Sequence, residues 1–245
     1  MSKRHGRFFI GTSGWSYDHW EGPFYPDGLS ADERLEYYAA RFNSVEINRS
    51  FYSLPDEQTL RSWRTQVPAG FRFAAKASRY ITHMKKLKDP QEGVVRLLSR
   101  MRVLGSALGP VLFQLPPRWR FNADRLESFL ECLADDLRYS FEFRDHSWLN
   151  KASYSLLARH RAAFCIYDLD GFVSPREVTT DFVYVRLHGP DGPYQGCYDR
   201  QALSGWAGAL STWSRQGLDV YCYFDNDQHG YAAHNAATLR DMLDS

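Results

Sequence analysis

One stretch in the second half of the chain decides the fold, and it reads Phe182-Val183-Tyr184-Val185-Arg186-Leu187-His188. Side-chain character alternates along it with the period of two that is typical of a β-strand, so Tyr184, Arg186 and His188 share one face. Seven further apolar runs of strand length end in polar or turn residues, at 7–12, 44–48, 71–76, 111–115, 140–144, 164–168 and 220–225. The sequence therefore predicts eight strands of similar design.

Helical patterns fill most of the gaps between these runs. Candidate helix starts with capping residues are Ser30 with Glu33, Asp56, Asp89 with Pro90, Asn122 and Asn150. Strands that alternate with helices favour a parallel α/β sheet, and eight units in 245 residues favour closure into a TIM (β/α)8-type barrel. The sixth unit is expected to lack a regular helix, because the segment 171–180 is too short. No linker divides the chain, so we expect a single domain over residues 1–245.

Composition and charge exclude several classes of protein. Lys+Arg 30 and Asp+Glu 29 leave a net charge of +1, so no overall field attracts nucleic acid or an anionic membrane. The four cysteines are too widely spaced for a C-x-x-C metal or redox site. No signal-peptide core and no run of about 18 apolar residues is present, so we expect a cytoplasmic protein without a membrane contact. Phosphate-loop, nucleophile-elbow and zinc-protease motifs are absent, and we predict no cofactor.

Candidate functional residues follow from the strand ends, because parallel barrels place their chemistry there and in the next loops. The candidates for catalysis are Glu46, Lys76, Glu142, Asp168 and His188. The candidates for substrate binding are Ser13, Trp15, Tyr17, Asn48, Gln114, Arg144, Trp148, Arg186 and Asn226. Buried ion pairs alone contribute little net stability, so we interpret this ring of charges as a site whose charged members converge in one cleft.

Within this set, Glu142 is predicted to be the acid–base residue and Arg144 the residue that fixes the substrate. Their i, i+2 spacing on one strand gives them a common face. Arg144 cannot lose its proton, which suits it to anchoring charge. The competing interpretation makes Glu142 only a counter-ion for Arg144 or Arg186.

The sequence resembles the YecE-like family of uncharacterised TIM-barrel proteins, a domain of unknown function. The matching stretches are Gly11-Thr12-Ser13-Gly14-Trp15, Phe42 to Asn48 with Ser50-Phe51-Tyr52, Phe71 to Lys76 with Ile81-Thr82-His83, Leu112 to Pro117, Glu142-Phe143-Arg144 with Ser147-Trp148, and Tyr223 to Asp227. The resemblance covers almost the whole chain and implies the barrel fold, but it supplies no reaction. This chain departs from its relatives at Asp225-Asn226, where they carry Asn-Asn.

Three functions remain open from the sequence. The first is a metal-independent enzyme that uses acid–base chemistry on a small anionic, sugar-like or nucleotide-like substrate, with aromatic loop residues as a stacking wall. The second is a divalent-metal enzyme of the sugar isomerase/epimerase or phosphodiesterase kind, whose metal ligands would be Glu142, Asp168, His188 and Asp225. The positive charges of Arg144 and Arg186 argue against this function, because they would repel the metal cation. The third is a non-enzymatic protein that binds a metabolite or a nucleic acid, the latter being possible but not favoured at this net charge. Nothing in the pattern indicates an oligomeric state.

Overall fold

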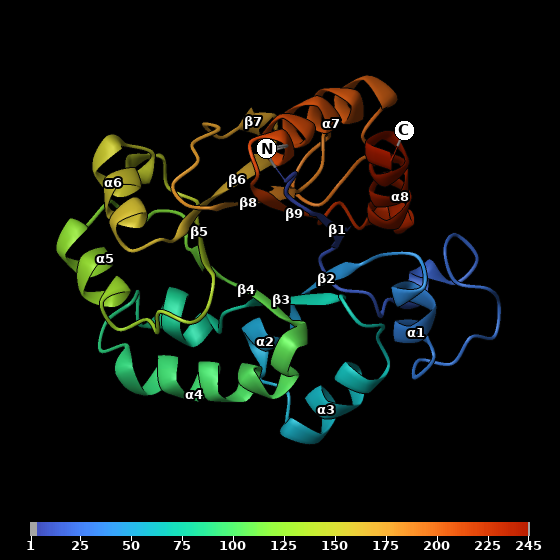
Figure 1. Cartoon of the computed structure of the whole chain (residues 1–245), viewed down its shortest axis with the longest axis horizontal. Helices are drawn as coiled ribbons and strands as arrows, with labels where there is room; N and C mark the ends of the chain where they lie inside the picture. The colour runs from blue at the N-terminus through green and yellow to red at the C-terminus, as the bar shows by residue number, and fades with distance from the viewer. Residues whose placement is uncertain (1–3, 245) are drawn as a thin grey trace.

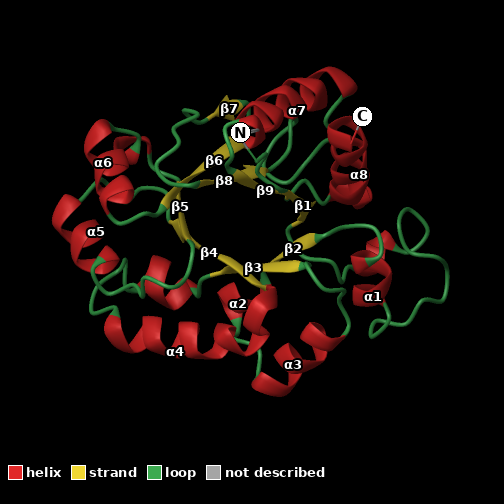
Figure 2. Ribbon diagram, in the orientation of Figure 1, coloured by secondary structure: helices red, strands yellow, loops and turns green. Residues whose placement is uncertain are grey.

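Eight parallel strands form a closed ring in the computed structural model, which describes residues 4–244 (Figures 1 and 2). The strands that form the ring are β1 (Phe8–Thr12), β2 (Ser44–Ile47), β3 (Arg72–Lys76), β4 (Leu108–Leu115), β5 (Tyr139–Phe143), β6 (Ala163–Leu169), β8 (Phe182–Leu187) and β9 (Asp219–Phe224). Their spatial order is β1-β9-β8-β6-β5-β4-β3-β2. Apart from the short β7, neighbours from β9 to β2 are consecutive in the chain, and β1 pairs with the last strand, β9, which confirms the predicted barrel.

Helices surround the ring on the outside (Figure 2). They are α1 (Arg34–Ala39), α2 (Arg49–Tyr52), α3 (Glu57–Thr65), α4 (Gln91–Met101), α5 (Ala123–Leu130), α6 (Lys151–Arg159), α7 (Arg200–Arg215) and α8 (Tyr231–Asp244). Short 3-10 turns η1 (Asp18–Trp20), η3 (Arg102–Ala107), η4 (His146–Trp148) and η5 (Gln228–Gly230) and the π-turn η2 (Tyr80–Met84) connect them. None of the helices within residues 4–244 has the length and apolar character needed to span a bilayer.

The predicted helix starts are confirmed in three of five places. Asp56, Asn122 and Asn150 each accept a hydrogen bond from a backbone N–H in the first turn of their helix. The Ser30–Glu33 pair does form, but it closes a turn, and α1 begins only at Arg34. Asp89 adopts a φ of 46°, which turns it out of the capping geometry, so α4 begins without a side-chain cap.

Side chains close the seam between β1 and β2 where a regular backbone ladder is missing. The amide oxygen of Asn43 accepts a hydrogen bond from the backbone N–H of Ile10 at 3.1 Å. The Tyr38 hydroxyl accepts from the N–H of Thr12 at 2.8 Å and donates to the carbonyl of Ser44 at 3.1 Å. These bonds satisfy buried backbone groups that would otherwise lose their partners.

Gly11 permits the close approach of the two strands at this seam. A Cβ atom at position 11 would lie 1.9 Å from the carbonyl oxygen of Ser44, so no larger residue fits there. Beyond it, Ser13 pairs with Glu46 in an isolated parallel bridge. The seam therefore brings the ends of β1 and β2 together at the top of the barrel.

The sixth unit has no helix, as the sequence predicts. In its place, β7 (Phe172–Val173) folds back antiparallel on the end of β6. The Thr179 hydroxyl then accepts from the N–H of Phe164 at 2.8 Å and donates to the carbonyl of Ala162 at 2.7 Å. This side chain replaces the helix as the anchor of the connection.

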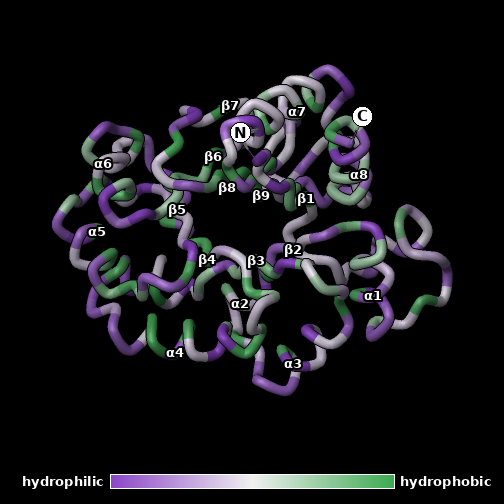
Figure 3. Tube along the Cα trace, viewed as in Figure 1, coloured by the Kyte–Doolittle hydropathy of each residue, from purple (hydrophilic) through white to green (hydrophobic). Residues whose placement is uncertain are grey.

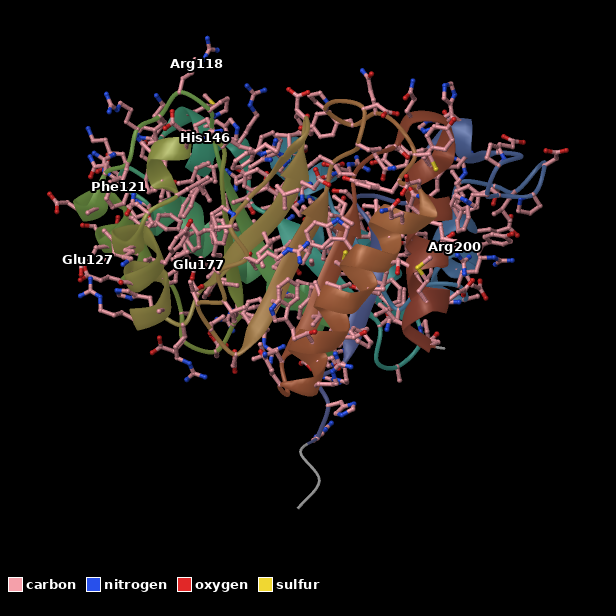
Figure 4. The ribbon with its side chains drawn as sticks, turned by 90° about the horizontal axis from the view of Figure 1, so that it is seen from above. Arg118, Phe121, Glu127, His146, Glu177 and Arg200 are labelled. Carbon is pink, nitrogen blue, oxygen red and sulfur yellow. The ribbon has the colours of Figure 1, made fainter. Side chains whose placement is uncertain are left out.

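The barrel has two apolar layers, one in its lumen and one between strands and helices. The lumen layer consists of Phe9, Ala74, Leu112, Ala163, Cys165, Phe182, Tyr184, Tyr221 and Tyr223. The hydrophilic segments of Figure 3 lie mainly in the loops and on the outer turns of the helices. In the side view of Figure 4, Arg118 and His146, from the loops after β4 and β5, mark the end of the barrel where the strands terminate. We call this end the mouth.

Candidate active site

A cavity of about 640 Å³ opens at the mouth, and we call it the mouth cavity. Its polar lining includes Lys76 from the end of β3, Asp225 just after β9 and Asn48 just after β2. Its aromatic lining consists of Trp15, Tyr17, Tyr52, Trp63 and Tyr194. The position agrees with the rule that barrels of this kind carry their sites where the strands end.

A fully buried arginine lies at the centre of the polar network beneath this cavity. The Arg186 guanidinium contacts the carboxylates of Glu46 at 2.7 Å, Glu142 at 2.8 Å and Asp225 at 2.9 Å. We call these three side chains the carboxylate cluster. Glu46 and Glu142 are as completely buried as Arg186. One guanidinium thus bridges three strands of the barrel.

Hydroxyl groups complete the contacts of Glu46. The Tyr184 hydroxyl donates to Oε2 of Glu46 at 2.6 Å, and the Ser13 hydroxyl donates to Oε1. Ser13 also accepts from Arg186 at 3.1 Å. Ser13 is therefore part of the buried network, and it does not line the cavity as a substrate contact would.

Glu142 is surrounded by donors. Gln114 donates to Oε1 at 3.0 Å and Arg144 donates to the same oxygen, while Arg186 contacts the other. Burial alone would raise the pKa of this carboxyl group, but the charges of Arg144 and Arg186 outweigh it and hold the pKa well below its usual range. Glu142 is consequently a permanent carboxylate that does not line the cavity. This geometry agrees with the counter-ion interpretation of Glu142.

His188 links the two sides of the network. Its Nδ1 lies 3.0 Å from Oδ2 of Asp225, and its Nε2 lies 3.0 Å from Nη2 of Arg144. Because a guanidinium only donates, Nε2 accepts and Nδ1 carries the proton that is donated to Asp225. Burial raises the pKa of Asp225, but Arg186 and His188 outweigh it, and the pKa falls to about 2. Asp225 therefore presents a fixed negative charge to the cavity.

Basic side chains gather on the other side of the mouth, and one of them, Lys76, has no counter-ion among the described residues. Lys76 is 8% exposed, and within residues 4–244 no carboxylate lies within ion-pair distance of it. Burial and the charge of Arg186 lower its pKa. His83 has its pKa lowered by burial and then by Lys76, Arg79 and Arg144. We call Lys76, Arg79, His83 and Arg144 the positive side of the mouth.

The aromatic lining is held in place by packing and by backbone contacts. Trp15 meets Trp63 edge to face at 4.8 Å between ring centroids. The Tyr17 hydroxyl donates to the carbonyl of Ser13 at 2.6 Å, and the Asn48 amide donates to the same carbonyl at 3.2 Å. Trp15, Tyr17 and Asn48 thus line the cavity at the positions that the sequence assigned to binding.

Three predicted site residues lie elsewhere. Asp168 lies on the outer face of β6 with Phe164 and Ile166, because the alternating residues Cys165 and Tyr167 face the lumen. Burial raises the pKa of the Asp168 carboxyl group. The prediction that Asp168 converges with the cluster is therefore wrong.

Trp148 and Asn226 also have structural surroundings. The η4 turn directs Trp148 into the layer between strands and helices, where it is fully buried and stacks on Phe143 at 5.0 Å. Asn226 donates to the carbonyl of Gly196 at 2.9 Å and to Asn235 at 2.8 Å, which ties a loop to α8. Neither side chain reaches the mouth cavity.

Asp225 and Tyr194 line the cavity but are absent from the predicted catalytic and binding residues, and the sequence offered Asp225 only as a ligand in the divalent-metal alternative. Asp225 follows Tyr223 by two positions, so the alternation of β9 could have placed it in the lumen. Tyr194 lies in the loop 189–198, and its N–H donates to the carbonyl of His188 at 2.6 Å. Only the glycine-rich character of that loop, which begins at Gly189, signals an unusual backbone there.

The donor set does not fit the divalent-metal alternative. The guanidinium of Arg186 already occupies the position between the carboxylates of the cluster, and no contact joins Asp168 to any of these carboxylates among the described residues. Across residues 4–244, no group of three or more His, Cys, Asp or Glu side chains has an arrangement that could hold a metal ion. A cation at this point would be repelled by Arg186 and Arg144.

Comparison with known proteins gives a consistent result. The model of the family described as "Protein of unknown function DUF72" matches residues 9–245. UPF0759 protein YunF of Bacillus subtilis is 26% identical over 96% of this chain and 94% of its own length. UPF0759 protein YecE of Escherichia coli is 32% identical over 58% of this chain and 50% of its own length.

Solved structures agree. A DUF72 family protein from Thermotoga maritima superimposes with a TM-score of 0.89 at 28% identity and covers 98% of this chain and 100% of its own. One from Enterococcus faecalis gives a TM-score of 0.82 at 20% identity and 99% coverage of both chains, which bears on the fold alone.

Proposed function

The chain belongs to the DUF72 family, whose description states no reaction, and from that premise we propose that it is an enzyme that binds a small anionic substrate in the mouth cavity and acts on it by acid–base chemistry. The barrel fold is common to enzymes but does not itself specify a reaction. The proposal therefore rests on the chemistry of the mouth.

The observation that carries the proposal is the uncompensated charge of Lys76. Every carboxylate of the cluster is bound to Arg186, and among the described residues none lies within ion-pair distance of Lys76. A cation that is buried without a counter-ion is costly, and an anionic ligand would relieve that cost. The carboxylate or phosphate of a substrate is the group that fits this place.

The aromatic lining supports a flat or ring-shaped body for the substrate. Trp15, Tyr17 and Tyr52 line the same cavity, and Tyr52 is 74% exposed. Exposed aromatic faces of this kind stack on sugar rings and on nucleobases. A sugar-like or nucleotide-like anion therefore matches both linings.

For proton transfer, the proposal moves the role from Glu142 to Lys76. Glu142 is held ionised and lies below the cavity, whereas Lys76 lines the cavity and has a lowered pKa. An amine whose pKa is lowered towards the working pH can accept a proton and return it. We assign Glu142 the role of positioning Arg144 and Arg186.

Binding of inorganic phosphate and of oxalate tests this proposal. A bound anion favours the protonated imidazole, so we expect the pKa of His83, followed by NMR, to rise when either anion is added. Lys76→Met should weaken this effect and the accompanying thermal stabilisation. Lys88→Met, which changes an exposed lysine of the same loop, should leave both unchanged. If neither anion moves the His83 titration in the unmodified protein, the proposed function is wrong.

A further inference from the structure

We propose that Lys76 forms a covalent iminium with a carbonyl group of the substrate. This inference rests on the proposed function, because the same anion-binding cavity delivers the carbonyl carbon to the amine. It assigns a substrate class, a small carbonyl compound that also carries a carboxylate or phosphate.

The position of Lys76 suits a nucleophile. It ends β3, a rigid strand of the barrel, and its side chain is nearly buried but lines the cavity. Its ammonium nitrogen lies 4.4 Å from the centroid of the Phe51 ring and has no carboxylate within ion-pair distance in residues 4–244. A lysine that only stabilised the fold would instead be expected to pair with a carboxylate, as Arg186 does three times.

The surroundings can also move the protons that the step requires. The amine must first lose a proton, and desolvation together with Arg186 favours that loss. Attack on the carbonyl carbon forms a C–N bond and gives a carbinolamine, whose nitrogen and oxygen exchange a proton. The C–O bond then breaks and water leaves, so that ammonium plus carbonyl compound gives iminium plus water with no change in charge. His83 is the neighbouring group that can accept and return the proton, because its pKa is lowered and its ring packs on Phe51, the same ring over which the Lys76 ammonium lies.

The product would be stabilised where it forms. The iminium keeps the positive charge on the Lys76 nitrogen, over the face of Phe51, where a cation–π contact persists. Asp225 supplies the opposite charge. The anionic group of the substrate would then lie towards Arg79, His83 and Arg144, the remaining members of the positive side.

Reductive trapping tests the iminium directly. Glyoxylate serves as the probe, because it is a very small aldehyde that carries a carboxylate. With cyanoborohydride at pH 7, the imine is reduced and the lysine becomes carboxymethylated, which peptide mass mapping locates. We expect Lys76 to react at least about 10-fold faster than exposed Lys88, because its lowered pKa leaves more of the amine unprotonated and the cavity holds the probe beside it.

Two readouts separate this inference from the function on which it rests. Lys76→Arg should abolish modification at position 76, yet glyoxylate should still raise the pKa of His83. If Lys76 in the unmodified protein reacts no faster than Lys88 while glyoxylate raises the His83 pKa, the iminium is refuted and anion binding stands. If glyoxylate changes neither, both proposals are refuted.

Discussion

Replacement of Arg186 by methionine would remove the one cation shared by the whole carboxylate cluster. In this variant, Glu142 would keep its ion pair with Arg144, and Asp225 would keep its contact with His188. Glu46 would keep only the hydroxyls of Ser13 and Tyr184. The variant therefore leaves one fully buried carboxylate without a cation.

The expected loss follows from that single unpaired charge. Removing one partner of a buried ion pair costs about 3–5 kcal/mol, against a total of about 5–15 kcal/mol for a folded domain. We therefore expect Arg186→Met to fold at pH 7 with its free energy of unfolding lower by about 3–5 kcal/mol. In the unmodified protein, the lowered pKa of Asp225 gives stability that is lost as the pH falls towards about 2.

Urea denaturation at pH 7 measures the loss in the variant. Glu46→Gln combined with Arg186→Met should recover part of the loss at pH 7, because the double variant carries no unpaired charge. Arg138→Met, which breaks an ion pair with Asp219 that is partly exposed, should cost about 1 kcal/mol or less. A loss below about 1 kcal/mol for Arg186→Met would contradict the reasoning.

Two further outcomes are expected. Gly11→Ala should lower the free energy of unfolding by more than about 3 kcal/mol, because its Cβ would meet the Ser44 carbonyl at 1.9 Å. Gly205→Ala, on a helix face with open space, should be neutral or stabilising. Chemical denaturation compares the two variants, and similar stabilities would contradict the close approach of β1 and β2 at Gly11. Asp168→Asn should leave phosphate binding unchanged. It should not destabilise the protein at pH 7, because burial raises the pKa of this carboxyl group, so that its ionisation opposes folding above the unfolded-state pKa. If phosphate no longer stabilised the variant in thermal melts, Asp168 would be part of the binding site.

The sequence predicts the barrel and much of the cluster for one physical reason. Side chains two apart on a strand share a face, so the alternation around Arg186 and Glu142 places both in the lumen with His188. The same rule fails for Asp168. Strand β6 is buried on both faces, so apolar Phe164 and Ile166 look no different from the lumen-facing Cys165. Taking the last polar residue of the strand then selects the wrong face.

Local turns account for the other differences. One residue separates Asp225, which lines the cavity, from Asn226, which binds a loop and α8. Trp148 looks like a stacking residue from its place after a strand, but the three-residue turn η4 carries it into the outer layer. Turn geometry of this kind depends on tertiary packing, and single-sequence patterns do not contain it.

The charges of the mouth indicate why its chemistry would centre on Lys76. Three carboxylates and Arg186 form a closed set in which each group has a partner, so none of them is free to bind a substrate. The guanidinium takes the position that a divalent metal would need, and its charge helps to keep the pKa of Glu142 and of Asp225 low. Lys76 lies outside this set, next to it and within reach of the cavity. The cluster pairs its own charges and, in residues 4–244, leaves Lys76 without a carboxylate at ion-pair distance, so a substrate that carries an anion can supply one.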